Sequence, residues 1–141
     1  MQPAGKVEDR AHNEVVLLIE NDHAIANMYA LGLNLSGYQV RIASSANSAL
    51  SEVSRLDHRP ELIVLDLEQP RVSGLDVLND LKASPAAWGL PVIVLADDEE
   101  ELCEAYRLGA TDCHPRYRTT PRQLVSYVGA ALTEGNRMRS P

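Results

Sequence analysis

Residues 62–66 read Leu62-Ile63-Val64-Leu65-Asp66, four consecutive apolar side chains followed by a carboxylate. A strand that is apolar on both faces has to be covered on both faces, which is typical of parallel sheets in α/β proteins. Two other runs have the same character, Val15–Ile19 and Pro91–Leu95. We therefore expect these three runs to form the middle of a parallel sheet.

Two weaker runs, Tyr38–Ile42 and one around Thr111–His114, complete a set of five expected strands. Segments of helical length separate the strands: Ala24–Leu35, Ala46–Leu56, Leu75–Lys82, Glu99–Leu108 and Pro121–Leu132. Gly37 and Gly109 follow two of these segments, where glycine commonly ends a helix, and Pro121 suits the first turn of the last. The alternation predicts an α/β fold, a doubly wound five-stranded parallel sheet with five flanking helices.

The length fits one domain. Of the 141 residues, the polar ends 1–13 and 134–141 are expected to be flexible tails, which leaves a domain of about 120 residues at 14–133. A separate output domain is therefore not expected. Hydrophobic residues make up 45% of the chain, whereas aromatic residues make up 4% with no Phe, so the core should be aliphatic.

The charge balance excludes some classes of partner. The formal net charge of −7 opposes nonspecific binding to a nucleic acid backbone. Cys103 and Cys113 form no Cys-x-x-Cys pair and are expected to be reduced. There is no apolar signal segment and no run long enough for a membrane span, so we expect a cytoplasmic protein without membrane contact.

Polar residues follow four of the expected strands. They are Glu20-Asn21-Asp22, then Asp66 and Glu68, then Ala96-Asp97-Asp98, and finally His114-Pro115-Arg116. Ligands of doubly wound sheets lie at the carboxyl ends of the strands. Glu20 and Asp66 would converge there on a shallow pocket suited to Mg²⁺, and Arg116 would add a cation able to hold a phosphoryl group. The alternative is that the carboxylates are only solvated strand ends.

The chain from about Val15 to Leu132 resembles the receiver domain of bacterial two-component response regulators. The motifs that carry the likeness are Leu17–Asp22, Glu61–Asp66 followed by Pro70 and Gly74, Leu90–Ala96, and Gly109–Asp112. Their combined spacing is specific, although each motif alone is weak. The resemblance implies a flavodoxin-like sheet with strand order 2-1-3-4-5, which is the known strand order of receivers.

The resemblance also implies a function. Asp66 would accept a phosphoryl group from a histidine kinase or phosphotransfer protein, and the activity would be limited to self-phosphorylation and dephosphorylation. Mg²⁺ would be held by Glu20, Asn21, Asp66 and the backbone carbonyl of Glu68. Signalling would pass to a downstream protein target. A homodimer could form through the face of the fourth helix, fifth strand and fifth helix, which includes Tyr106, Cys113 and Tyr117.

Four positions depart from the family pattern. Asn21 replaces a metal-ligating Asp, Ala96 replaces the switch Ser or Thr, and Cys113 replaces the switch aromatic residue. Arg116-Tyr117 falls where Lys-Pro is expected, although a shifted alignment would place His114-Pro115 there. An uncharged amide binds Mg²⁺ less strongly than a carboxylate, so metal affinity should fall unless Glu20 or Asp22 compensates.

Two functions follow from these residues. The first is a single-domain response regulator in a phosphorelay, supported by Asp66 and the cation of Arg116. The alternative is a degenerate receiver that binds protein partners whether or not it is phosphorylated. Asn21, Ala96 and Cys113 favour the alternative.

Overall fold

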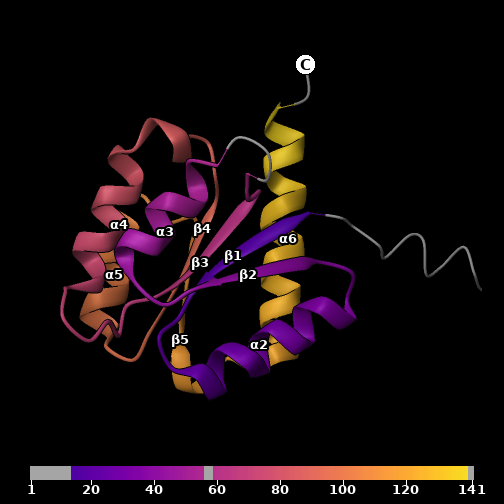
Figure 1. Cartoon of the computed structure of the whole chain (residues 1–141), viewed down its shortest axis with the longest axis horizontal. Coiled ribbons are helices and arrows are strands. Elements are labelled where there is room, and N and C mark those ends of the chain that lie inside the picture. Colours follow the sequence, from indigo (N-terminus) through magenta and orange to yellow (C-terminus); the bar gives the residue numbers. More distant parts are fainter. Residues whose placement is uncertain (1–13, 56–58, 140–141) are drawn as a thin grey trace, which may run out of the picture.

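The computed structural model describes residues 14–55 and 59–139, in which five strands alternate with helices (Figure 1). The strands are β1 Val15–Ile19, β2 Gln39–Ala43, β3 Leu62–Asp66, β4 Val92–Ala96 and β5 Asp112–Pro115. The helices are α2 His23–Leu35, α3 Ala46–Val53, α4 Gly74–Ala83, α5 Glu99–Arg107 and α6 Pro121–Arg139, with short 3₁₀ turns η1 Pro85–Ala87 and η2 Arg116–Arg118. The expected tail at 1–13 lies outside the described residues.

All strand pairs of the sheet are parallel, and the order is β2-β1-β3-β4-β5, as expected. The three continuous apolar runs form β1, β3 and β4, which are the interior strands. The register pairs Ile19 with Leu65, Asp66 with Leu95, and Ala96 with Pro115. The carboxyl ends of the strands therefore lie level along one edge of the sheet, which is where the polar residues follow.

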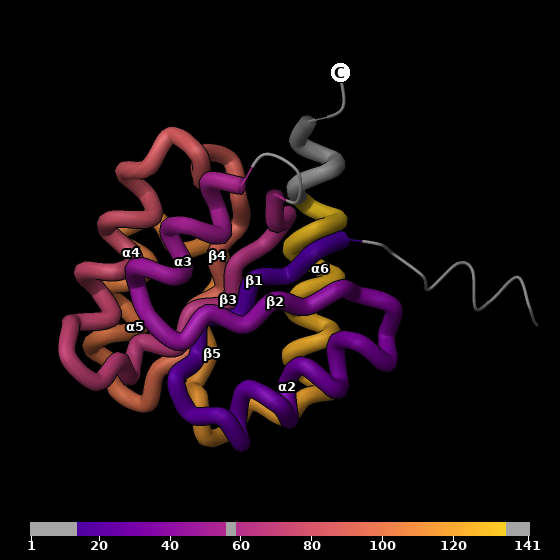
Figure 2. Tube along the Cα trace, viewed as in Figure 1, coloured from indigo at the N-terminus to yellow at the C-terminus, as the bar shows by residue number. Residues whose placement is uncertain are grey.

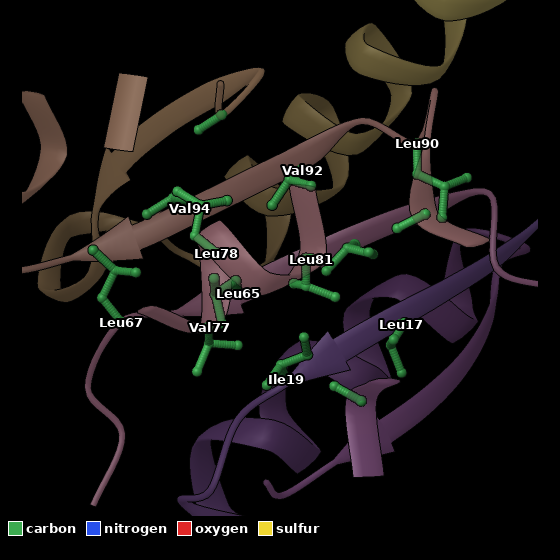
Figure 3. Close-up of a cluster of buried hydrophobic side chains, with 14 of the residues drawn as sticks. Leu17, Ile19, Leu65, Leu67, Val77, Leu78, Leu81, Leu90, Val92 and Val94 are labelled. Carbon is green, nitrogen blue, oxygen red and sulfur yellow. The ribbon is translucent and has the colours of Figure 1, made fainter. Parts of the chain in front are cut away.

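Helices cover both faces of the sheet, with α3, α4 and α5 on one side and α2 and α6 on the other (Figures 1 and 2). Alternate residues of each strand point to opposite faces, so the interior divides into two hydrophobic clusters. Leu17 and Leu65 pack with α4 in the first cluster, which Figure 3 shows, whereas Leu18 and Val64 pack with α2 and α6 in the second. The expected aliphatic core is present, and Tyr29 is the largest side chain in it that is fully buried.

Turn residues end and begin the helices as expected. Gly37 and Gly109 have φ angles of 99° and 105°, a left-handed conformation that favours glycine. At the start of α6, the Thr120 hydroxyl accepts a hydrogen bond from the Gln123 N–H at 3.1 Å, and the Gln123 side-chain oxygen accepts one from the Thr120 N–H at 2.9 Å. This reciprocal capping box fixes where α6 begins.

Two helix ends differ from the expectation by more than one residue. Helix α6 continues to Arg139 rather than stopping at Leu132, so the expected domain boundary at 133 falls inside a helix. Polar residues after Leu132 indicated a tail, but they are compatible with a helix, and one glycine costs a helix only about 1 kcal/mol. Helix α3 ends at Val53. Within the described residues, no helix is both long and apolar enough to cross a membrane.

Candidate functional site

Asp66 is the last residue of β3, and its side chain is completely buried at the carboxyl edge of the sheet. One carboxylate oxygen, Oδ1, accepts a hydrogen bond from the Glu68 N–H at 2.9 Å. The Gln69 side-chain amide donates to the Asp66 backbone carbonyl at 2.5 Å. These local contacts hold both the carboxylate and the loop that follows it in one orientation.

The loop after Asp66 is also fixed by close packing at Gly74, the first residue of α4. A Cβ atom built on Gly74 would lie 2.3 Å from the Leu67 carbonyl oxygen and 2.4 Å from the Leu67 Cα. Only glycine fits so near to another backbone segment. The glycine eight residues after Asp66 therefore allows α4 to begin directly against the site loop.

Arg116 supplies the cation of the site. It lies in η2, just after β5, and its Nε is 2.9 Å from Asp66 Oδ2, while its Nη1 is 3.5 Å from Asp97 Oδ2. Burial disfavours the charged guanidinium, but the negative charge of Asp66, and next that of Glu20, outweighs burial and raises the pKa of Arg116. The group therefore stays protonated and neutralises part of the carboxylate cluster.

Glu20 is the second buried carboxylate at this edge, with an exposed fraction of 2%. Its Oε2 accepts a hydrogen bond from the Asp22 N–H at 3.2 Å, whereas no hydrogen-bond donor of the described residues reaches its buried Oε1. Burial, followed by the interaction with Asp66, raises the pKa of Glu20 to about 8. The raised pKa favours the protonated form of Glu20, which relieves the repulsion between the two carboxyl groups.

Asn21 and Asp22 follow Glu20 and have different roles. Asn21 is half-buried beside Glu20, at the position expected for a metal ligand. Asp22 is exposed and caps α2, because its Oδ1 accepts hydrogen bonds from the N–H groups of Ala24 and Ile25 at 3.0 and 3.1 Å. Asp22 is therefore engaged as a helix cap and does not replace the charge that Asn21 lacks.

The donor set for a metal consists of the Glu20 and Asp66 carboxylates and the Asn21 amide. Within the part of the chain that the structure describes, no three His, Cys, Asp or Glu side chains are grouped for a metal ion. Mg²⁺ is usually held by one or two carboxylates and keeps several waters, so this smaller set still fits it. The buried Oε1 of Glu20, which no hydrogen-bond donor of the described residues reaches, is an oxygen that such an ion could take.

Asp97, one of the polar residues expected to follow the fourth strand, belongs to the site. The next residue, Asp98, caps α5, and the glutamates at 99–101 lie in the first turn of that helix. Asp97 instead faces Arg116, and its Oδ1 accepts a hydrogen bond from the Tyr117 N–H at 3.2 Å. Its position directly after β4 is the sequence signal that places it at this edge, whereas its contact with Arg116 is not visible in the sequence.

The expected switch positions have few polar contacts. Ala96 is fully buried at the end of β4 and carries no hydroxyl. Cys113 is half-buried on β5, and its N–H donates to Asp112 Oδ1 at 3.1 Å and to the Tyr106 hydroxyl at 3.2 Å. Asp97 therefore joins the loops after β4 and β5, a connection that neither Ala96 nor Cys113 makes.

His114 does not approach Asp66. Its Nε2 lies 2.7 Å from Asp112 Oδ2, and its ring stacks on Tyr127 with ring centroids 3.5 Å apart. The structure therefore brings Arg116, and not His114, to the Asp66 carboxylate. Every peptide bond of the described residues is trans, including those before Pro115 and Tyr117.

Comparison with known proteins identifies related sequences. The family described as "Response regulator receiver domain" matches residues 16–124. The transcriptional regulatory protein KdpE of Mycobacterium tuberculosis is 36% identical over 116 residues, which cover 81% of this chain and 47% of that protein. The probable transcriptional regulatory protein TcrX of the same species is 35% identical over 115 residues, covering 80% and 46%. The chain thus spans about half the length of the curated relatives it matches.

Solved structures show the same architecture. A putative response regulator from Chloroflexus aurantiacus superposes with a TM-score of 0.77 at 25% identity, covering 86% of this chain and 98% of that one. A CheY-like response regulator receiver domain protein from Methanospirillum hungatei gives a TM-score of 0.78 at 22% identity, covering 89% and 98%. The expected order of the five strands and the resemblance to receivers are both confirmed.

Proposed function

The chain belongs to the response regulator receiver domain family, and on this premise we propose that its signalling depends on a phosphoryl group accepted by Asp66. The donor would be a histidine kinase or a phosphotransfer protein, and the output would be a contact with a downstream protein. The observation that carries the proposal is the buried Asp66 carboxylate with Arg116 Nε at 2.9 Å. A carboxylate oriented in this way can act as a nucleophile towards phosphorus.

Each residue of the site has a place in this reaction. An oxygen of Asp66 attacks phosphorus while the bond to the donor breaks, and the guanidinium of Arg116 can hold two phosphoryl oxygens at once. Glu20, Asn21, Asp66 and the carbonyl of Glu68 would hold Mg²⁺, which when bound neutralises charge on the transferred group. The hydrogen bond from the Glu68 N–H keeps the Asp66 carboxylate in position.

A second candidate function is favoured by specific observations. Asn21 brings no charge to a metal, and buried Ala96 offers no hydroxyl to a phosphoryl group. Asp97 already places a carboxylate 3.5 Å from Arg116, where it would repel an incoming phosphoryl group. These features suit a receiver that binds its protein partners independently of phosphorylation.

Intact mass spectrometry separates the two functions. The protein is incubated with acetyl phosphate and Mg²⁺, and the mass is followed over time. We expect a gain of one phosphoryl group that is absent in Asp66→Asn. We expect a faster gain in Asn21→Asp, because this variant restores a charged metal ligand.

The same experiment can overturn the proposal. If neither the natural protein nor Asn21→Asp gains mass at high donor and metal concentrations, Asp66 is not a phosphoacceptor. The phosphorylation-independent function is then the one that stands. Arg118→Gln serves as a control, because the Arg118 side chain is exposed and its guanidinium lies over the ring of Tyr117.

A further inference from the structure

Two buried polar atoms of the site face each other without a well-formed hydrogen bond. Arg116 Nε and Asp66 Oδ2 lie 2.9 Å apart and both are buried, yet neither has a hydrogen-bond partner of good geometry among the described residues. Buried polar groups are nearly always hydrogen-bonded, so an unpaired donor beside Asp66 indicates a position that can receive an oxygen of a substrate. A phosphoryl group joined to Asp66 would bring such an oxygen to Arg116.

Another nitrogen of the same guanidinium faces Asp97. Arg116 Nη1 is 3.5 Å from Asp97 Oδ2, and the second oxygen of that carboxylate accepts a hydrogen bond from the Tyr117 N–H at 3.2 Å. A guanidinium and a backbone N–H are also the kinds of group that bind phosphoryl oxygens. A carboxylate of the chain itself therefore lies against the groups that a phosphoryl group on Asp66 would use.

Asp97 is placed so that its side chain can leave this position. The residue before it, Ala96, is fully buried and the residue after it, Asp98, caps α5, so the backbone is held on both sides. The Asp97 side chain is 41% exposed, and ion pairs that are partly exposed to water contribute little to stability. Rotation of the side chain into solvent would therefore break its two contacts at a small cost and without a movement of β4.

We infer that Asp97 competes internally for Arg116, and that phosphorylation of Asp66 displaces it. This inference rests on the proposed function, because it concerns how that reaction is controlled. In the transfer, an oxygen of Asp66 forms a bond to phosphorus while the bond from phosphorus to the donor breaks, and the leaving group keeps the electron pair of that bond. The phosphoryl group then carries a charge of about −1.5 to −2, against −1 for a carboxylate, so it binds the guanidinium more strongly than Asp97 does.

Displacement of Asp97 supplies a response that Ala96 cannot give, since Ala96 has no hydroxyl to bind the phosphoryl group. Once Asp97 leaves, the Tyr117 N–H loses its acceptor, and this side chain no longer joins the loop after β4 to η2. The response to phosphorylation is then the release of a contact. Before phosphorylation, the same carboxylate repels an anionic donor and slows the reaction.

Initial rates of phosphorylation test the inference, measured by intact mass of the full chain with acetyl phosphate and saturating Mg²⁺. Asp97→Asn removes the charge but keeps an oxygen that can accept from the Tyr117 N–H, whereas Asp97→Ala removes both. We expect each variant to react about three to ten times faster than the natural protein, the effect of removing one partly exposed like charge. Glu100→Gln removes the same charge from an exposed residue in the first turn of α5 and should react at the natural rate.

Ionic strength separates an effect of charge from an effect of structure. Salt screens interactions between partly exposed charges, so the ratio of the Asp97→Asn rate to the natural rate should decrease between about 0.1 M and 1 M sodium chloride. A substitution that acts only by changing the structure of the loop would leave this ratio constant.

The failure of the inference and the failure of the proposed function give different results. A mass gain at equal rates in the natural protein and Asp97→Asn overturns the competition and leaves the proposed function standing, and so does a ratio that salt does not change. No mass gain in any of these proteins refutes the proposed function, and the inference with it. Asp66→Asn combined with Asp97→Asn should gain no mass, which assigns the measured gain to Asp66.

Discussion

Replacing Arg116 with Gln should destabilise the fold, because it leaves the fully buried Asp66 carboxylate without the cation 2.9 Å away. Unit charges about 4 Å apart interact by about 4 kcal/mol at an effective dielectric constant of 20. Removing one partner of a buried pair typically costs about 3–5 kcal/mol. Arg116 retains 22% exposure, which lets water replace part of the interaction, so we expect a loss of about 2–3 kcal/mol.

Urea unfolding followed by circular dichroism at neutral pH measures this loss. The single tryptophan, Trp88, is 67% exposed and so is a poor fluorescence probe of the core. In thermal unfolding, the same loss corresponds to a Tm lower by about 8–12 °C for a domain of this size. The double variant Asp66→Asn, Arg116→Gln should recover most of the stability, because it no longer buries an unpaired charge.

Arg118→Gln is the matched control, since Arg118 is exposed and should change the free energy of unfolding by less than about 0.5 kcal/mol. If Arg116→Gln is as stable as this control, Asp66 does not depend on Arg116 for its burial. The charge arrangement derived for the site would then be refuted.

Three other changes have measurable outcomes. Gly74→Ala should lower the free energy of unfolding by about 2–3 kcal/mol, because its Cβ would lie 2.3 Å from the Leu67 carbonyl oxygen; a natural Tm would show that α4 can move away. Iodoacetamide at pH 8 should modify the exposed Cys103 long before Cys113, since burial raises the pKa of Cys113 to about 12. Peptide mass mapping measures the two rates, and equal rates would show that the burial of Cys113 is not maintained. Tyr29→Phe should cost about 1 kcal/mol in urea unfolding by removing a 2.6 Å hydrogen bond to a buried backbone carbonyl, whereas no change would mean that water replaces the hydroxyl.

The interior strands could be predicted closely because burial on both faces leaves a continuous apolar run. The bounds of β1 agree with the expected Val15–Ile19. The edge strands have weaker patterns, and β2 begins one residue later than expected, at Gln39. The end of α6 could not be read from composition, since polar residues such as Glu134 occur both in exposed helices and in tails.

Part of the site could also be predicted, because parallel strands bring Glu20 and Asp66 to one edge. The choice between Arg116 and His114 depends on how β5 pairs with β4 and on the turn at η2, which short-range patterns do not specify. Asp97 precedes four other acidic residues, a pattern that is also typical of the first turn of a helix. Its contact with Arg116 depends on the meeting of two loops that are distant in the sequence.

The two hydrophobic clusters lie on opposite faces of the sheet and share no side chain. A displacement of α5 therefore reaches α2 through the strands or through loops at the edge of the sheet. The segment 116–119 is one such loop, because Arg116 contacts Asp66 and Asp97, while the Thr119 carbonyl accepts the hydrogen bond of Tyr29 in α2. A change of charge at Asp66 is thus connected to a helix on the far face through the four residues 116–119.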